Sequence, residues 1–216
     1  SGGIIDAASF AASFQLPVGG IAYHHAVGDL DGDGRADLAA VGETANHLAI
    51  YRNVSSPGNL SSASFEARVD FPTGTGPQAV ALADLDGDGK LDAAVANFSS
   101  GTLSVFRNIG TSGAWTTSSF ASAVSMTTGA SQPNHLAIAD LDRDGKPDVA
   151  VSHAGGSMSV YRNTSAAGNI TFASAVTFTA GSQPQWIAAG DLDGDGKMDL
   201  LTANYNSGNV SLFRNT

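Results

Sequence analysis

The sequence predicts an all-β protein, a β-propeller built from four copies of a four-stranded antiparallel blade. Three observations carry this prediction: an acidic nine-residue motif occurs four times, its copies are almost evenly spaced, and short strand-like apolar segments flank every copy. The motifs span residues 29–37, 84–92, 140–148 and 191–199, which gives steps of 55, 56 and 51 residues. A period of this length in β-rich sequence is typical of propeller blades or a related array.

Each repeat carries the signals of up to four strands. Short apolar runs such as Val80–Ala83 and Ala93–Ala96 lie before and after the acidic motif, and they predict strands buried on both faces. A third run alternates and ends in Arg-Asn, as in Leu103–Asn108, which predicts a strand with one buried face. The fourth run, such as Ser119–Met126, is more polar and fits an outer edge strand. The acidic motif therefore connects the innermost strand to the second.

The repeats form one predicted domain at residues 7–216, preceded by an N-terminal tail at residues 1–6. The chain begins out of phase, because residues 9–16 have the pattern of a fourth strand while the last repeat finishes on a third strand. We expect the strand at 9–16 to complete the last blade, since closing a ring removes exposed edges. Four repeats fit a four-bladed ring, half of an eight-bladed homodimer, or a fragment of a larger propeller.

The acidic motif has the chemistry of a calcium loop. Aspartate stands at positions one, three, five and nine of every copy, with glycine at position six. Carboxylates this close repel one another unless a cation lies among them, and oxygen ligands around a tight glycine turn suit Ca²⁺. The glutamate that closes an EF-hand loop at position twelve is absent, so the ninth-position aspartate must close the site. The alternative is four Asp-Gly turns that hold no metal.

We therefore predict about four structural Ca²⁺ ions per chain. The predicted side-chain ligands are the four aspartates of each motif: Asp29, Asp31, Asp33, Asp37, Asp84, Asp86, Asp88, Asp92, Asp140, Asp142, Asp144, Asp148, Asp191, Asp193, Asp195 and Asp199. The predicted backbone carbonyl ligands are those at position seven: Arg35, Lys90, Lys146 and Lys197.

The overall charge of −10 reflects these motifs, because they contain sixteen of the twenty acidic residues. The sequence has no basic footprint for nucleic acid. It contains no cysteine, which excludes disulfides and thiolate metal sites. It also has no run of eighteen apolar residues, so we predict no membrane span.

The acidic loop, the lead-in typified by Pro184–Ala188 and the strand ending in Arg-Asn resemble FG-GAP/VCBS-type repeats, the units of the integrin α-subunit β-propeller. The motif sequences most resemble those of bacterial surface and secreted proteins that carry such repeats. The resemblance covers about residues 7–216 and implies an extracellular or cell-surface propeller with Ca²⁺ between the first and second strands. Two features depart from the family: integrin propellers have seven blades, and Ala22 replaces the lead-in proline in the first repeat.

The end of the blades opposite the acidic loops is the predicted ligand face, for a protein or a glycan. Its linkers and loops vary between repeats and carry aromatic and amide side chains, which stack on sugars and bind hydroxyls. The candidates are Tyr23, His24, Gln78, Asn134, His135, Gln185, Trp186, Asn97, Phe98, His153, Asn204 and Tyr205. The alternative is that these residues only pack between blades and terminate turns.

We expect no catalytic activity, because the histidines form no His-x-x-x-His motif and the paired carboxylates belong to the metal loops. The preferred function is a calcium-binding, integrin-like module that mediates adhesion or ligand binding. The alternatives are a carbohydrate-binding lectin propeller and the non-catalytic propeller of a larger secreted enzyme.

Overall fold

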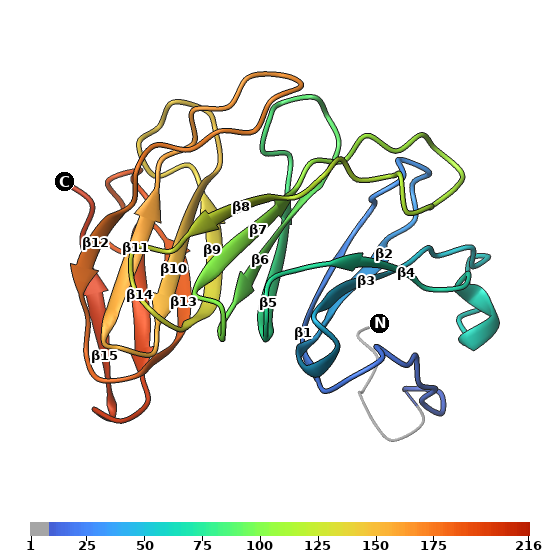
Figure 1. Ribbon diagram of the computed structural model, residues 1–216, viewed down its shortest axis with the longest axis horizontal. Coiled ribbons are helices and arrows are strands. Elements are labelled where there is room, and N and C mark those ends of the chain that lie inside the picture. The colour runs from blue at the N-terminus through green and yellow to red at the C-terminus, as the bar shows by residue number, and fades with distance from the viewer. Residues whose placement is uncertain (1–8) are drawn as a thin grey trace, which may run out of the picture.

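The computed structural model describes residues 9–216 and confirms the all-β, propeller-type fold (Figure 1). The predicted tail at residues 1–6 lies outside the described residues. The strands form four antiparallel sheets, each corresponding to one repeat. The first sheet contains β1 (Ala22–Gly28), β2 (Asp37–Gly42), β3 (His47–Tyr51) and β4 (Val69–Pro72). The second contains β5 (Pro77–Ala83), β6 (Asp92–Asn97), β7 (Thr102–Phe106) and β8 (Val124–Thr127). The third contains β9 (Pro133–Ala139), β10 (Asp148–His153), β11 (Ser157–Tyr161) and β12 (Val176–Thr179). The fourth has three strands, β13 (Pro184–Gly190), β14 (Asp199–Asn204) and β15 (Asn209–Phe213).

Each sheet is a simple meander in which consecutive strands are hydrogen-bonded neighbours. The acidic loop connects its first two strands, as predicted. Near the start of every first strand the register shifts by one residue, for example between Pro77 and Ala79. Such a bulge redirects the local side chains. The linker residues before the four first strands are therefore placed in the same way in every blade.

The first strands of successive sheets lie side by side, β1 against β5, β5 against β9, and β9 against β13. This arrangement places one blade per sheet around a common inner face. The arc is open in the described residues: the first sheet and the last sheet lie at opposite ends of the molecule in Figure 1. Three apolar clusters fill the spaces between neighbouring blades. They bury the second strands of the first three blades almost completely, as the continuous apolar runs predict, whereas β14 in the last blade is partly exposed.

The fourth strands are shorter than the sequence suggests. The second residue of each polar run is a phenylalanine that makes only an isolated bridge to the asparagine of Arg-Asn, and the regular strand starts four residues after it. These bridges are Asn53 to Phe65, Asn108 to Phe120 and Asn163 to Phe172. The connection between the third and fourth strands is thereby fixed to its own blade at both ends.

The prediction that residues 9–16 complete the last blade is wrong for a single chain. These residues form no strand, and the segment lies on the first sheet, where the Phe14 ring is 6.3 Å from that of Phe65. The Pro17 carbonyl accepts hydrogen bonds from Tyr51 Oη at 2.5 Å and from Arg68 Nη1 at 2.7 Å. The first and last sheets lie at opposite ends of the open arc, so this segment cannot reach β15 while it keeps these contacts.

Helical structure in residues 9–216 is limited to two short 3-10 turns, η1 (Glu43–Ala45) and η2 (Ser62–Ser64). No helix in this described part of the chain has the length and apolar character needed to cross a membrane.

Candidate metal centres and ligand face

The first aspartate of each acidic loop organises the turn. In the second blade, Asp84 accepts the backbone N–H groups of Asp88 at 3.0 Å and Gly89 at 2.9 Å through its two carboxylate oxygens. Gly89 has a φ of 86°, a left-handed conformation that side chains with a Cβ rarely adopt. The glycine at position six therefore lets the backbone curl around the first carboxylate. The glycine contact recurs in the other three loops through Asp29, Asp140 and Asp191, and Asp29 and Asp140 also accept the amide of the aspartate at position five.

The ninth-position aspartate fastens the loop to the third strand. Asp92 is 0% exposed, and its carboxylate accepts Leu85 N–H at 2.9 Å and Asn108 N–H at 2.8 Å. Burial raises the pKa of Asp92 to about 6, because desolvation disfavours the carboxylate. The equivalent pair of hydrogen bonds from backbone N–H groups forms at Asp37, Asp148 and Asp199. This structural role was not apparent from the sequence, where position nine was considered only as a ligand.

The carboxylates converge closely enough for one cation per loop. In each loop, three aspartates offer oxygen atoms that all lie within 4.8 Å of one another. These groups are Asp29, Asp31 and Asp33; Asp84, Asp86 and Asp92; Asp140, Asp142 and Asp148; and Asp191, Asp193 and Asp199. Calcium–oxygen distances of about 2.3–2.6 Å allow two ligands of one ion to be separated by roughly 5 Å at most. The donor set and its spacing therefore fit Ca²⁺.

An arginine from the end of each third strand contacts the same loop. Arg52 pairs with Asp31 at 2.5 Å and with Asp33 at 2.8 Å. Arg107, Arg162 and Arg214 occupy the same place in the other blades. The repeated Arg-Asn signal pointed to this role, but the sequence reasoning used it only to mark a strand end. In the first, second and fourth loops, one such arginine and one basic residue at position seven leave the four aspartates with a net charge of about −2, which one Ca²⁺ balances. The third loop also contains Arg143, so its net charge is about −1.

The backbone amides of the position-seven residues make the same contact in all four loops. The backbone N–H of Lys90 donates to Asp88 at 3.0 Å, and its Nζ donates to the Gly110 carbonyl at 2.7 Å. The other three position-seven amides also bond to the aspartate at position five. Their carbonyl groups as calcium ligands stay a prediction.

The asparagine of Arg-Asn links neighbouring loops. Asn108 Nδ2 donates to the Leu30 carbonyl in the loop of the preceding blade at 2.7 Å, and Asn163 does the same to Leu85 at 2.9 Å. Asn215 repeats the contact with Leu141 at 2.7 Å. The four acidic loops are thus connected by hydrogen bonds in a row along one end of the arc.

Five of the predicted ligand-face residues have buried side chains that hold the fold instead: Gln78, Asn97, Asn134, His153 and Asn204. Three of them occupy the same position at the end of the second strand and bind a serine on the third strand. The bonds are Asn97 to Ser104 at 2.9 Å, His153 to Ser159 at 3.0 Å and Asn204 to Ser211 at 2.8 Å. Burial lowers the pKa of His153 to about 4.

Three other predicted residues meet on the inner face. His24 Nε2 lies 3.1 Å from His135 Nε2, and the Trp186 ring is 4.2 Å from the His135 ring. Burial, and then the neighbouring His24, lower the pKa of His135 to about 4. The histidine pair is therefore neutral near pH 7, and the cluster packs the first, third and fourth blades together.

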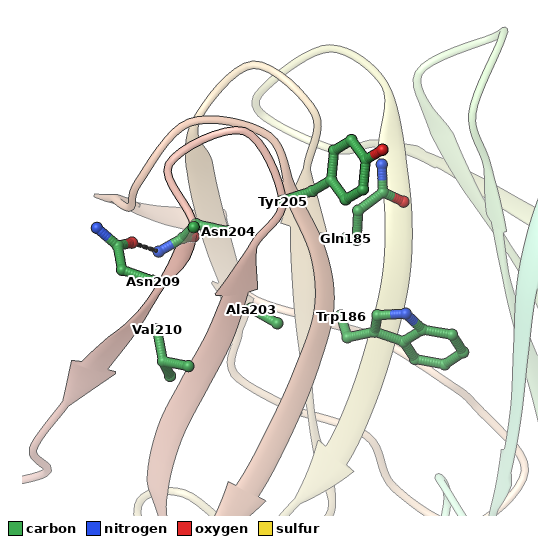
Figure 2. A pocket seen from close by; sticks show the side chains of 8 residues that line it. Gln185, Trp186, Ala203, Asn204, Tyr205, Asn209 and Val210 are labelled. Atoms are coloured by element: carbon green, nitrogen blue, oxygen red, sulfur yellow. Dashed lines mark hydrogen bonds between the residues drawn. The ribbon is translucent and has the colours of Figure 1, made fainter.

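The exposed remainder of the ligand face is aromatic. Trp186 is 55% exposed and Tyr205 is 74% exposed, and Tyr23 is also exposed, whereas Phe98 is half-buried. The last blade carries an open pocket of about 640 Å³. Figure 2 shows Gln185, Tyr205 and Trp186 on one side of it, with Asn204 and Asn209 on the other. The structure brings the predicted residues Gln185, Trp186, Asn204 and Tyr205 of the last blade together at one pocket, and Asn209, which was not predicted, also lines it.

Four repeated antiparallel sheets around one inner face, each with an acidic loop between its first two strands, define a propeller-type repeat protein. Comparison with family models identifies the repeat. The model of the FG-GAP-like repeat matches residues 29–95, 87–151 and 140–202, and the chain belongs to this family.

Solved structures with a similar fold include two proteins of different description. The chain is 16% identical to BBS1N, crystallised in complex with ARL6DN and soaked with lead, with a TM-score of 0.54 over 91% of this chain and 58% of that one. It is 19% identical to the V. cholerae biofilm matrix protein Bap1, with a TM-score of 0.51 over 83% of this chain and 24% of that one. The chain thus spans about half, and about a quarter, of these two proteins. A search of curated proteins finds no match.

Proposed function

We propose that the chain is a calcium-stabilised, integrin-like propeller module of an extracellular protein, and that it mediates adhesion or ligand binding. The acidic loops carry this proposal. Every loop gathers three carboxylates within 4.8 Å and keeps a negative charge after its basic partners are counted, about −2 in three loops and about −1 in the third, which contains Arg143. An uncompensated cluster of this kind is costly, so a divalent cation would stabilise the folded blade.

The role of the ion in this proposal is structural. Its ligands join the first hairpin of a blade to the end of the third strand, because Asp92 also accepts the Asn108 amide. The same asparagine reaches the loop of the preceding blade through Leu30. A filled loop would therefore stiffen its own blade and the contact with its neighbour. Extracellular calcium is millimolar, so moderate affinity is sufficient.

Calcium titration calorimetry on chelator-treated protein tests this proposal. We expect about four Ca²⁺ bound per chain and a melting temperature that falls markedly in EGTA. Asp191→Ala should remove one ion from the count and loosen the last blade, since Asp191 accepts Gly196 N–H at 2.9 Å within that loop. Asp70→Ala, outside the loops, is the matched control and should leave four. If the protein takes up no calcium and its melting temperature is unchanged in EGTA, the proposal is wrong.

Adhesion is supported by the setting in which similar folds occur. Bap1 is described as a biofilm matrix protein, and the likeness to it covers most of this chain. The exposed aromatic side chains at the end opposite the calcium loops offer a surface for such a partner.

The pocket in Figure 2 favours a second candidate function, a glycan-binding lectin. Exposed Trp186 and Tyr205 offer rings for stacking, and Gln185 and Asn209 offer amides for hydroxyl groups. A glycan array with the native chain and Tyr205→Ala separates the candidates. A glycan bound by the native chain and lost in Tyr205→Ala, but retained in Leu192→Ala at the opposite end, supports the lectin. No binding across a broad panel leaves the protein-ligand proposal.

A further inference from the structure

The outer edge of the last blade lacks what every other blade has. β3, β7 and β11 each pair with a fourth strand, whereas no strand in residues 9–216 pairs with the outer edge of β15. Val210 and Leu212 on β15 are 56% and 63% exposed, although their equivalents in the first blade, Leu48 and Ile50, are fully buried. An unpaired apolar edge of this kind is a template for another strand.

The groove beside this edge also lacks a side chain. Between the first two blades, Phe71 and Phe106 lie 6.3 Å apart, and Phe120 covers them with its ring 4.9 Å from that of Phe71. Between the last two blades, Phe178 and Phe213 repeat the pair at 6.2 Å. No third ring covers them in the described chain, and they line an apolar cavity of about 480 Å³.

The missing pieces have their counterpart near the start of the same chain. In the first three blades a phenylalanine precedes the fourth strand by four residues, as Phe120 precedes Val124–Thr127. Phe10 precedes residues 14–17 by the same interval, and the segment Phe10–Pro17 shares the alternation of the other three. Phe10 is 77% exposed, so its side chain does not pack in the core of its own chain.

The segment also sits where a fourth strand belongs. Tyr161, at the end of β11, donates its hydroxyl to the carbonyl of Thr127, the last residue of the preceding blade's fourth strand, at 2.9 Å. Tyr51 holds the same position in β3 and donates to Pro17. The partners are 34 residues apart in both cases. Residues 14–17 therefore occupy the fourth-strand position of a blade that would precede the first.

We propose that the Phe10–Pro17 segment of one copy of this chain pairs with β15 of a second copy. Phe10 then enters the cavity beside Phe178 and Phe213. The register follows from the other blades, where Phe71 faces Leu48, Met126 faces Leu103 and Phe178 faces Met158. By the same register, Leu16 faces Val210 of the other copy.

A second copy fits better than the same chain because the two complementary features lie at opposite ends of the open arc (Figure 1). The hydrogen bonds from Tyr51 and Arg68 also fix Pro17 to its own first sheet. If two copies exchange this contact reciprocally, each free edge is covered, and the ring closes with eight blades. That number lies within the range of known propellers.

Cysteine cross-linking tests the pairing, because the natural chain has no cysteine. Leu16→Cys combined with Val210→Cys should yield, on oxidation, a reducible species of twice the chain mass of 21.7 kDa. Leu16→Cys with Ser211→Cys is the register control and should link poorly, since adjacent strand residues point to opposite faces. Met158→Cys with Phe178→Cys should link within one chain and shows that the chemistry works. A Leu16–Val210 link formed within a single chain would overturn the proposal.

Light scattering provides the independent measurement. The native chain should have twice the monomer mass, and Phe10→Asp should shift it to the monomer with an unchanged circular dichroism spectrum, because Phe10 is exposed in the single chain. A monomeric native chain, or a dimer that Phe10→Asp leaves intact, would contradict the proposed contact. Calcium uptake is measured separately, so either failure leaves the proposed function standing.

Discussion

Replacing Asp92 with asparagine separates the two roles of the ninth position. The Asp92 carboxylate accepts two backbone amides, from Leu85 and Asn108, in a fully buried site. Asparagine has one acceptor oxygen, so one amide loses its partner and faces an NH₂ group. We therefore expect Asp92→Asn to destabilise the protein even when no calcium is present.

The magnitude follows from the two contacts. Losing one hydrogen bond to a charged group and stranding one buried N–H each cost on the order of 1–3 kcal/mol. The pKa of Asp92, raised to about 6 by burial, means that removing the charge recovers part of this cost. The net loss should be about 2–3 kcal/mol, which lowers the melting temperature of a chain of this size by roughly 4–12 °C.

Urea unfolding in EGTA and in millimolar calcium measures the effect. Asp88→Asn is the matched control, because asparagine at position five can still accept the Lys90 amide through its oxygen. Asp88→Asn should be nearly neutral in EGTA and weaken the stabilisation by calcium, whereas Asp92→Asn should be destabilised in both conditions. Equal stability of Asp92→Asn and the native chain in EGTA would refute the reasoning.

Three further substitutions test charged and titratable groups in the blades. Arg52→Gln leaves the buried Asp31 without its charged partner and should cost about 3 kcal/mol in EGTA. Arg162→Gln, at the same position on a more exposed surface, should cost clearly less; equal losses by urea unfolding would contradict this. His153→Asn should remove a pH dependence, because the pKa of His153 is lowered from 6.5 to about 4 and the native state must exclude a proton that the unfolded chain binds. Native stability should fall by up to roughly 3 kcal/mol between pH 6.5 and 4, and this variant should lose less while keeping the serine contact that Asn97 and Asn204 make. Identical pH profiles would show that His153 does not titrate in this way.

The fold was predictable because the same pattern of strands and acidic loop occurs in four repeats. The apolar runs on both sides of each acidic motif became the buried first and second strands, and the alternating run ending in Arg-Asn became the third. The position of residues 9–16 was not predictable, because the pattern of a fourth strand does not say which third strand it joins. That choice depends on the curvature of the whole arc and on contacts such as Tyr51 with Pro17.

The candidate sites were predictable to different degrees. Aspartate spacing was enough to bring three carboxylates together in each loop. The amides of Asn97 and Asn204 could not be distinguished from ligand-binding groups in advance, because the same side chain serves a turn or a ligand depending on burial. The serine two residues into the third strand, present in three repeats, was the available signal that these side chains bond internally.

A crystal structure grown in calcium tests the central claim most directly. We predict one Ca²⁺ in each acidic loop, bound by aspartate oxygens at about 2.3–2.6 Å. The arginine partners should stay at the outer carboxylate oxygens, as Arg52 does at Asp31. Loops that contain only water under these conditions, or in which the arginine takes the place of the ion, would contradict the account.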